Sequence, residues 1–248
     1  MVLKTGTITQ HKKHYVLPWG PWTALIVAFA AYFAAQISMF LPLAAWGVFN
    51  PGEPIESSIG SSTWFNLVLT GFSSLILILV LWIFLKYKKT GFSSLGFSKF
   101  IKKDFLWIII GIAIYLALTS TALLAASFIP NFDVNQAQNV GYGSARGWQL
   151  LLAFVGLVVI PPVAEEMLFR GFLYRGLATK WPKILSALIA SSLFALVHLQ
   201  WNVAVDVFVL SLVMIFILEK TQNLWVCIIL HSIKNFMAFL VLFVFAIK

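Results

Sequence analysis

A few side chains able to carry out acid–base chemistry lie inside apolar stretches of the second half of the chain. Glu165 and Glu166 are adjacent within the run VGLVVIPPVAEEMLFRGFLY. His198 and His231 lie in two later apolar stretches, and Asn235 follows His231 by four residues. An ionisable group in the middle of a membrane helix costs about 2.5–3.5 kcal/mol on insertion scales, so its presence needs a reason. These residue types indicate either hydrolysis, with a carboxylate as base, or a path for protons or cations.

The spacing within each stretch indicates which side chains share a helix face. Glu166 and Arg170 are four residues apart with the acid first, which is the favourable order for an ion pair. Glu165 lies about 100° around the helix from Glu166. We therefore expect Arg170 to neutralise Glu166 and Glu165 to face another group. His231 and Asn235 are also four apart and must project from one face.

Helix geometry predicts that three apolar segments bring these groups to a similar depth. Counted at about 1.5 Å per residue from the basic or polar ends of their segments, Glu165 and His198 lie roughly 20 and 22 Å in. His231 and Asn235 lie roughly 12 and 18 Å in by the same count. Phe194, four residues before His198, shares its face. The sequence therefore predicts one site, open to the cytoplasm if it is open to water.

The composition places this site in a membrane protein. Of 248 residues, 61% are hydrophobic, 16% are aromatic and 10% are charged, and the mean hydropathy is +0.95. A soluble domain is about half apolar and about a quarter charged, so a soluble protein is excluded, and so is a disordered chain. The single cysteine, Cys227, also excludes an internal disulfide scaffold. We expect an all-α, polytopic transmembrane helix bundle.

The apolar runs predict about seven spans, within a range of six to eight. Most are near the twenty or so residues that cross a bilayer. The sixth run is short and contains Asp206, so we expect that helix to be tilted, partial or buried among its neighbours. The expected spans cover 22–43, 64–85, 105–129, a segment from 148 through the prolines at 161–162, 184–199, 203–218 and 224–247.

The net charge of +9 comes from short basic segments at the N-terminus, at 86–103 and at 175–183. Short basic loops between apolar spans are typical of the positive-inside rule and not of nucleic-acid binding. We therefore expect an integral protein of a prokaryotic plasma membrane, with a cytoplasmic N-terminus and no nucleic-acid partner. The basic residues of 99–103 would attract anionic membrane lipids.

Three motifs resemble those of a known family. Glu165-Glu166-Met-Leu-Phe-Arg170 matches EExxxR, Phe194-Ala-Leu-Val-His198 matches FxxxH, and His231-Ser-Ile-Lys-Asn235 matches HxxxN. In this order, on successive apolar helices, they resemble the CPBP intramembrane proteases. That family includes the type II CAAX prenyl endopeptidases and prokaryotic relatives linked to bacteriocin immunity. The resemblance covers about 148–240.

The resemblance implies packed transmembrane helices that enclose a polar catalytic cavity, and it divides the chain in two. Residues 1–147 would form a variable N-terminal region with three spans. Residues 148–248 would form the catalytic core. The implied activity is hydrolysis of a peptide bond, expected near the cytoplasmic face. The substrate would be a peptide or a prenylated protein, and the sequence leaves the oligomeric state open.

The resemblance also implies roles for the catalytic residues. Glu165 would be the general base that activates water, helped by His198, while His231 and Asn235 would hold the developing oxyanion. The same carboxylate and two imidazoles, Glu165, His198 and His231, are also a plausible zinc set with one position left for water. No HExxH helix is present. We favour metal-free catalysis and keep zinc as the alternative cofactor.

The remaining motif residues would support the site. Glu166 and Arg170 would hold its shape, and Phe194 would pack beneath His198. Two other functions fit the same residues. One is a transporter or channel in which Glu165, His198 and Asp206 form a proton or cation path. The other is a non-catalytic immunity or scaffold protein that retains the motifs for structure.

Overall fold

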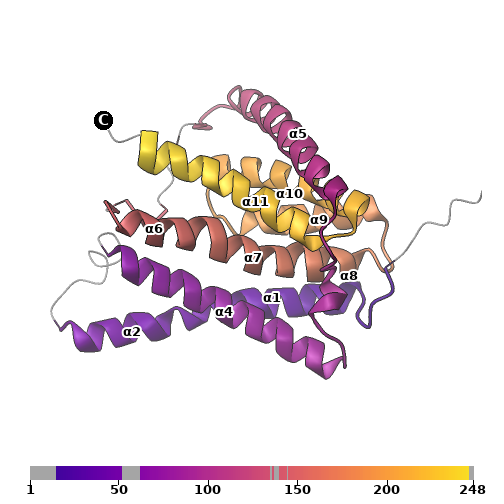
Figure 1. The fold of residues 1–248 in the computed structure, drawn as a ribbon, viewed down its shortest axis with the longest axis horizontal. Helices are drawn as coiled ribbons and strands as arrows, with labels where there is room; N and C mark the ends of the chain where they lie inside the picture. Colours follow the sequence, from indigo (N-terminus) through magenta and orange to yellow (C-terminus); the bar gives the residue numbers. More distant parts are fainter. Residues whose placement is uncertain (1–14, 52–61, 135, 137–139, 144, 246–248) are drawn as a thin grey trace, which may run out of the picture.

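The computed structural model describes residues 15–51, 62–134, 136, 140–143 and 145–245, and its regular elements are all helices (Figure 1). Helices make up 78% of it, and no strand occurs among the described residues. The predicted all-helical class is confirmed. The basic N-terminal segment at 1–14 lies outside the described residues.

In the first half of the chain, the described residues form four helices and one short 3₁₀ turn. They are α1 (Pro21–Ser38), α2 (Phe40–Phe49), α4 (Thr63–Tyr87), the 3₁₀ turn η1 (Phe92–Leu95) and α5 (Lys102–Ala126). A long irregular helix follows, made of α6 (Gln149–Phe154), the π-helical η2 (Val155–Val159), α7 (Ile160–Glu166), the π-helical η3 (Met167–Tyr174) and α8 (Arg175–Leu177). The chain then forms α9 (Lys183–Leu196), α10 (Trp201–Thr221), α11 (Leu224–Phe239) and the π-helical η4 (Leu240–Phe245).

Six of these helical stretches are long and apolar enough to cross a membrane, within the predicted range of six to eight. The exception among the seven expected spans is α9, whose 14 residues extend only about 21 Å. The sixth span is not short, because α10 has 21 residues and is a full-length candidate, but its expected burial among neighbouring helices is confirmed, since half of it is buried. The short helix is the one before it. The turn that follows α9 ends at Leu199, which has a left-handed φ of 53°.

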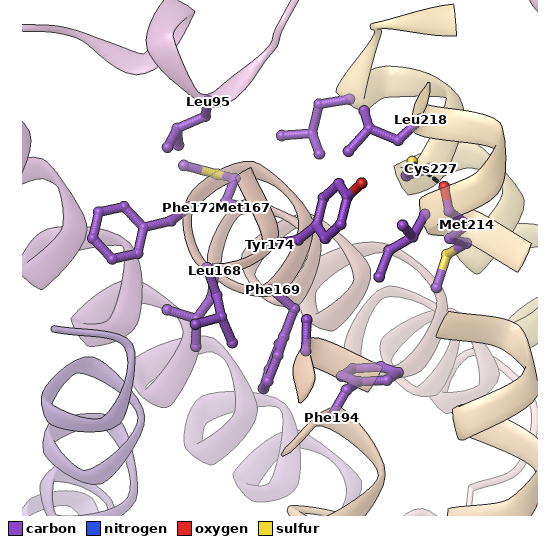
Figure 2. Close-up of a cluster of buried hydrophobic side chains, with 14 of the residues drawn as sticks. Leu95, Met167, Leu168, Phe169, Phe172, Tyr174, Phe194, Met214, Leu218 and Cys227 are labelled. Atoms are coloured by element: carbon purple, nitrogen blue, oxygen red, sulfur yellow. Dashed lines mark hydrogen bonds between the residues drawn. The ribbon is translucent and has the colours of Figure 1, made fainter. Parts of the chain in front are cut away.

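The segment that carries EExxxR lies in the middle of the bundle. All eight residues of η3 are buried. Five of their side chains are labelled in Figure 2 and point in different directions from the helix towards its neighbours, namely Met167, Leu168, Phe169, Phe172 and Tyr174. Leu95 of η1, Phe194 of α9 and Met214 of α10 belong to the same cluster. The motif is therefore held from several sides.

Small residues bring α1 close to this central helix. Ala24, Ala28, Ala31 and Ala35 are all buried, at spacings of three and four residues, so they lie on one face. Small side chains let helix backbones approach closely in membranes, where packing drives association. The neighbouring Tyr32 is partly buried and packs against the same core.

Most described cations gather at one end of the bundle, which we call the cationic end. They lie in the α4–α5 connection, in the α8–α9 connection and at the end of α10, namely Lys86, Lys88, Lys89, Lys99, Lys102, Lys103, Arg175, Lys180, Lys183 and Lys220. Glu219 ties this end together, because it accepts hydrogen bonds from Tyr15 at 2.7 Å and Tyr174 at 2.9 Å and pairs with Lys183. Burial and the bond to Glu219 raise the pKa of Tyr15 well above its usual range, so its hydroxyl remains a donor.

The loop between α5 and α6 lies at the opposite end. Asn202, at the start of α10, donates to the carbonyl of Gln136 at 2.9 Å. The hydroxyl oxygen of Tyr142, in the same loop, lies 3.2 Å from the hydroxyl oxygen of Thr70 in the first half of α4. These contacts define a second end, with the loop packed over the start of α4 and α10.

Candidate active site

One pocket of about 230 Å³ contains all four residues predicted to be catalytic. Glu165, His198, His231 and Asn235 line it together with Lys234. The remaining lining is apolar and comes from η2, α7, α10, α11, η4 and the α5–α6 loop. The structure therefore brings the three motifs together from different helices, as their spacing predicted.

Glu166 lies behind this pocket as a buried anchor. Its Oε1 accepts a hydrogen bond from Arg170 Nη1 at 2.9 Å, and His231 Nδ1 lies 2.8 Å from the same oxygen. The Glu166 and Arg170 side chains are completely buried, and 4% of the His231 side chain is exposed. The expected pairing of Glu166 with Arg170 is present. The contact to His231 adds a tie between α7 and α11.

This anchor fixes the orientation of the His231 ring. A carboxylate only accepts hydrogen bonds, so Nδ1 of His231 carries a hydrogen and donates a hydrogen bond to Glu166. The other ring nitrogen, Nε2, faces Glu165 Oε2 at 3.9 Å. Neutral His231 therefore has an unprotonated Nε2, and only the imidazolium can donate a hydrogen bond from Nε2.

Glu165 is the more open of the two adjacent carboxylates. Its side chain is 29% exposed, whereas that of Glu166 is fully buried. The difference follows from the rotation of about 100° between successive residues on a helix. Glu165 is free to meet water in the pocket, and Glu166 is not.

His198 is oriented through its backbone neighbour on α9. Its Nδ1 lies 2.8 Å from the carbonyl oxygen of Phe194, which can only accept, so Nδ1 is the donor and Nε2 is left for the site. The Phe194 ring packs edge-to-face against His198, with 5.0 Å between ring centroids. The centroid of the Phe194 ring also lies 5.9 Å from that of His231 and 4.2 Å from Cζ of Arg170. Phe194 therefore packs between both imidazoles and the buried arginine.

Asn235 binds a backbone carbonyl that has no partner within its own helix. Its Nδ2 donates to the carbonyl of Leu157 at 2.9 Å. That carbonyl would bond to the N–H of residue 161 in an α-helix or of residue 162 in a π-helix, but Pro161 and Pro162 have no N–H. Asn235 supplies the missing donor and keeps one amide hydrogen for the pocket.

We expect Asn235→Ala to lower the free energy of unfolding by about 1–3 kcal/mol, because the Leu157 carbonyl would lose its donor in an apolar setting. Thermal unfolding of the purified protein in detergent measures the change. The matched control is Asn235→Ala combined with Pro161→Ala, which restores a backbone N–H one turn after Leu157 and should recover part of the loss. An unchanged melting temperature in the single variant would contradict the prediction.

The comparisons with known proteins agree with this geometry. Residues 147–237 match the family described as type II CAAX prenyl endopeptidase, Rce1-like. This match supports assignment to the CPBP/CAAX protease family. No curated protein and no solved structure matches the chain. The Rce1-like region contains all three motifs, and together with the six apolar helices it supports a protease that is an integral membrane protein.

Glu165, His198 and His231 are the three side chains that the sequence suggested as zinc ligands. Among the described residues, no group of three or more His, Cys, Asp or Glu side chains is placed to hold a metal ion. Nδ1 of His231 is directed at Glu166 and Nδ1 of His198 at Phe194, which leaves one nitrogen on each ring. Nε2 of each ring and the Glu165 carboxylate are thus left for the pocket, and no step below uses a metal.

Lys234 is a site residue that the motif analysis missed. It lines the pocket and lies 3.1 Å, Nζ to Oδ2, from Asp206 on α10. Oδ1 of Asp206 accepts hydrogen bonds from Tyr115 at 2.6 Å and Thr119 at 2.8 Å. The signal was a cation inside an apolar helix, one residue before Asn235. Asp206 is thus paired with Lys234. It is not among the described residues that line the pocket, whereas a proton path through the pocket and Asp206 would require that contact.

Tyr32 is a second residue that sequence reasoning missed. It comes from α1, outside the Rce1-like region, and its hydroxyl donates to the carbonyl of Val197 at 3.3 Å. It is also close enough to Glu165 to interact with it electrostatically. No spacing rule could have found it, because the contact depends on how α1 packs against α9.

The direction of the pocket differs from the expectation. Along the last helix it runs from His231 to Leu242, and on α10 it includes Val203 and Val207 of the first two turns. Val140 of the α5–α6 loop also lines it. These parts lie towards the end opposite the cationic end. The pocket therefore extends away from the basic loops, not towards the side on which an opening was expected.

Proposed function

We propose that this protein is a metal-free intramembrane endopeptidase in which Glu165 activates the attacking water. The observation that supports the proposal is that two adjacent carboxylates have different surroundings. Glu166 is buried and paired with Arg170 and His231, while Glu165 is partly exposed in the pocket that His198 and His231 share. A carboxylate in a largely apolar pocket is well suited to act as a base near neutral pH.

The reaction follows from the groups in the pocket. Glu165 takes a proton from water as the water oxygen bonds to the peptide carbonyl carbon and the carbonyl electrons move to oxygen. The tetrahedral intermediate then collapses, the C–N bond breaks, and the proton on Glu165 passes to the leaving amine. His198, whose Nε2 is left for the site, assists the proton transfers at the attacking water.

The negative charge on the carbonyl oxygen needs donors that are already in place. The second amide hydrogen of Asn235 is one. Nε2 of His231 is the other when the ring carries a proton there, because the Glu166 contact turns Nε2 towards Glu165 and the pocket. The Glu166–Arg170 pair thus supports catalysis indirectly, because it orients the ring.

The proposed substrate is a peptide or a prenylated protein that reaches the pocket from within or along the membrane. The name of the matching family supports this class. An apolar groove of about 790 Å³ runs between α1, η3 and α9, and Tyr32 lies in it.

Cleavage of a quenched-fluorescent peptide library tests the proposal. The protein is purified in detergent, one subset of peptides is farnesylated on a C-terminal CAAX cysteine, and Glu165→Ala is the control. Cleavage by the wild type and not by the variant is the expected result, with no change when a chelator is added. If the chelator abolishes cleavage, a metal takes the place of the proposed mechanism. If no peptide is cleaved, the immunity or scaffold alternative gains over the protease.

A further inference from the structure

His198 lies just beyond the end of its helix, since α9 ends at Leu196. The N–H of His198 bonds only three residues back, to the carbonyl of Ala195 at 3.1 Å, so the last turn is tightened. The last carbonyls of a helix have no partner within it and must be satisfied from outside. The backbone that carries His198 is therefore not held by a regular helix alone.

Tyr32 of α1 supplies one of these outside partners. Its hydroxyl lies 3.3 Å from the carbonyl oxygen of Val197, which can only accept, so the hydroxyl donates. Among the described residues it is the one hydrogen-bond donor to this carbonyl. The two groups meet because the buried alanines of α1 let that helix pack closely against the bundle, and Tyr32 itself is partly buried.

The Val197 carbonyl belongs to the same peptide plane as the Cα of His198. A peptide group is planar, so a bond that fixes this oxygen also fixes the direction in which the His198 backbone leaves the helix. The imidazole ring has a second anchor, because its Nδ1 donates to the carbonyl of Phe194 at 2.8 Å. With both anchors in place, α1 and α9 together determine where Nε2 of His198 lies.

The bond from Tyr32 also lies near the proposed base. Tyr32 is close enough to Glu165 to interact with it electrostatically, and Glu165 and His198 line the same pocket. A rotation of the 197–198 peptide plane changes the distance between His198 Nε2 and Glu165. A displacement of about 1 Å in a reacting group can cost about 10²-fold in rate, so a small loss of order at this carbonyl affects catalysis.

We propose that Tyr32 is a positioning residue, which holds the Val197 carbonyl and thereby sets His198 for proton transfer at the attacking water. This inference rests on the proposed function, because it is in that reaction that His198 assists Glu165. Tyr32 acts through His198 and does not contact the reacting atoms. It lies outside the Rce1-like region at 147–237, so the N-terminal part of the chain contributes to the chemistry.

Tyr32→Phe tests the proposal, because it removes the hydroxyl and keeps the ring. We expect kcat to fall by about 10–10²-fold with little change in KM and in the melting temperature. Tyr15→Phe is the matched control. It also removes one hydroxyl that ties the N-terminal part of the chain to the Rce1-like region, but its partner is Glu219 at the cationic end, so kcat should equal that of the wild type.

A measurement on the ring itself does not depend on turnover. The protein is labelled with ¹⁵N-histidine in detergent, and the ring nitrogens of His198 and His231 are assigned from the signals lost in His198→Gln and His231→Gln. Tyr32→Phe should shift the His198 signals and leave those of His231 unchanged, because His231 is anchored by Glu166. Tyr15→Phe should shift neither.

The outcomes separate this inference from the proposed function. If Tyr32→Phe keeps wild-type kcat, or if its His198 signals do not move, the positioning role is wrong and the protease stands. A raised KM with an unchanged kcat would mean that Tyr32 binds substrate instead, and equal losses of kcat and melting temperature in both tyrosine variants would mean general destabilisation. Either result overturns the inference. If the wild type cleaves no peptide, the proposed function fails, and the His198 signals still decide whether Tyr32 positions this ring.

Discussion

Glu165→Gln is expected to lower kcat by about 10²–10⁴-fold, the contribution of a positioned general base. Glutamine has nearly the same size and shape but does not take a proton from water at neutral pH. The side chain is 29% exposed, and its closest charged contact is His231 Nε2 at 3.9 Å, so the fold should tolerate the change. Steady-state cleavage and thermal unfolding of the same preparation measure the two effects.

The neighbouring carboxylate provides the control. Glu166→Gln has the same chemistry but removes a charge that holds both Arg170 and His231. We expect it to lower the melting temperature, whereas Glu165→Gln should leave the melting temperature close to that of the wild type. Wild-type kcat in Glu165→Gln would end the proposal that this carboxylate is the base.

The sequence predicted the contacts that lie along one helix. Glu166 and Arg170 are four residues apart, and their ion pair has the expected partners. Phe194 and His198 are also four apart, and their rings are in contact. Helix geometry alone is sufficient for such pairs, because the backbone fixes which side chains lie above one another.

The contacts between helices could not be predicted in the same way. The bond from His231 to Glu166 joins α11 to α7, and the bond from Asn235 to Leu157 joins α11 to η2. The pair of Lys234 and Asp206 joins α11 to α10. Each depends on the rotation and depth of two packed helices, which the hydrophobic pattern of a membrane span leaves undetermined because almost every position is apolar.

The span boundaries failed for a related reason. The expected span 203–218 left out the more polar residues at both ends, yet α10 runs from Trp201 to Thr221, and Asp206 inside it is satisfied within the bundle. The helix α9 looked longer than it is, because Val197 and Leu199 continue its apolar pattern after the helix has ended at Leu196. Polar residues at the ends of a helix shorten the predicted span, and an apolar turn after a helix lengthens it.

Arg170→Met is expected to destabilise the protein by about 3–5 kcal/mol, the loss typical when one partner of a buried ion pair is removed. Arg170 is completely buried, and its guanidinium is stacked on Phe194. Methionine keeps much of the side-chain volume, so the loss comes from leaving the Glu166 carboxylate with His231 as its one described charged partner. Chemical or thermal unfolding in detergent, compared with the wild type, measures the effect.

The double variant Glu166→Gln with Arg170→Met separates charge from position. Neutralising both partners removes the uncompensated buried charge, and replacing a buried pair by neutral groups is often close to neutral in stability, so the melting temperature should recover relative to Arg170→Met alone. Activity should not recover with it. His231 would face an amide in place of the carboxylate that orients its ring, and the donor proposed for the oxyanion would no longer be held in place. A double variant that regains both stability and kcat would show that the charge of the Glu166–Arg170 pair is not needed to orient His231 for catalysis.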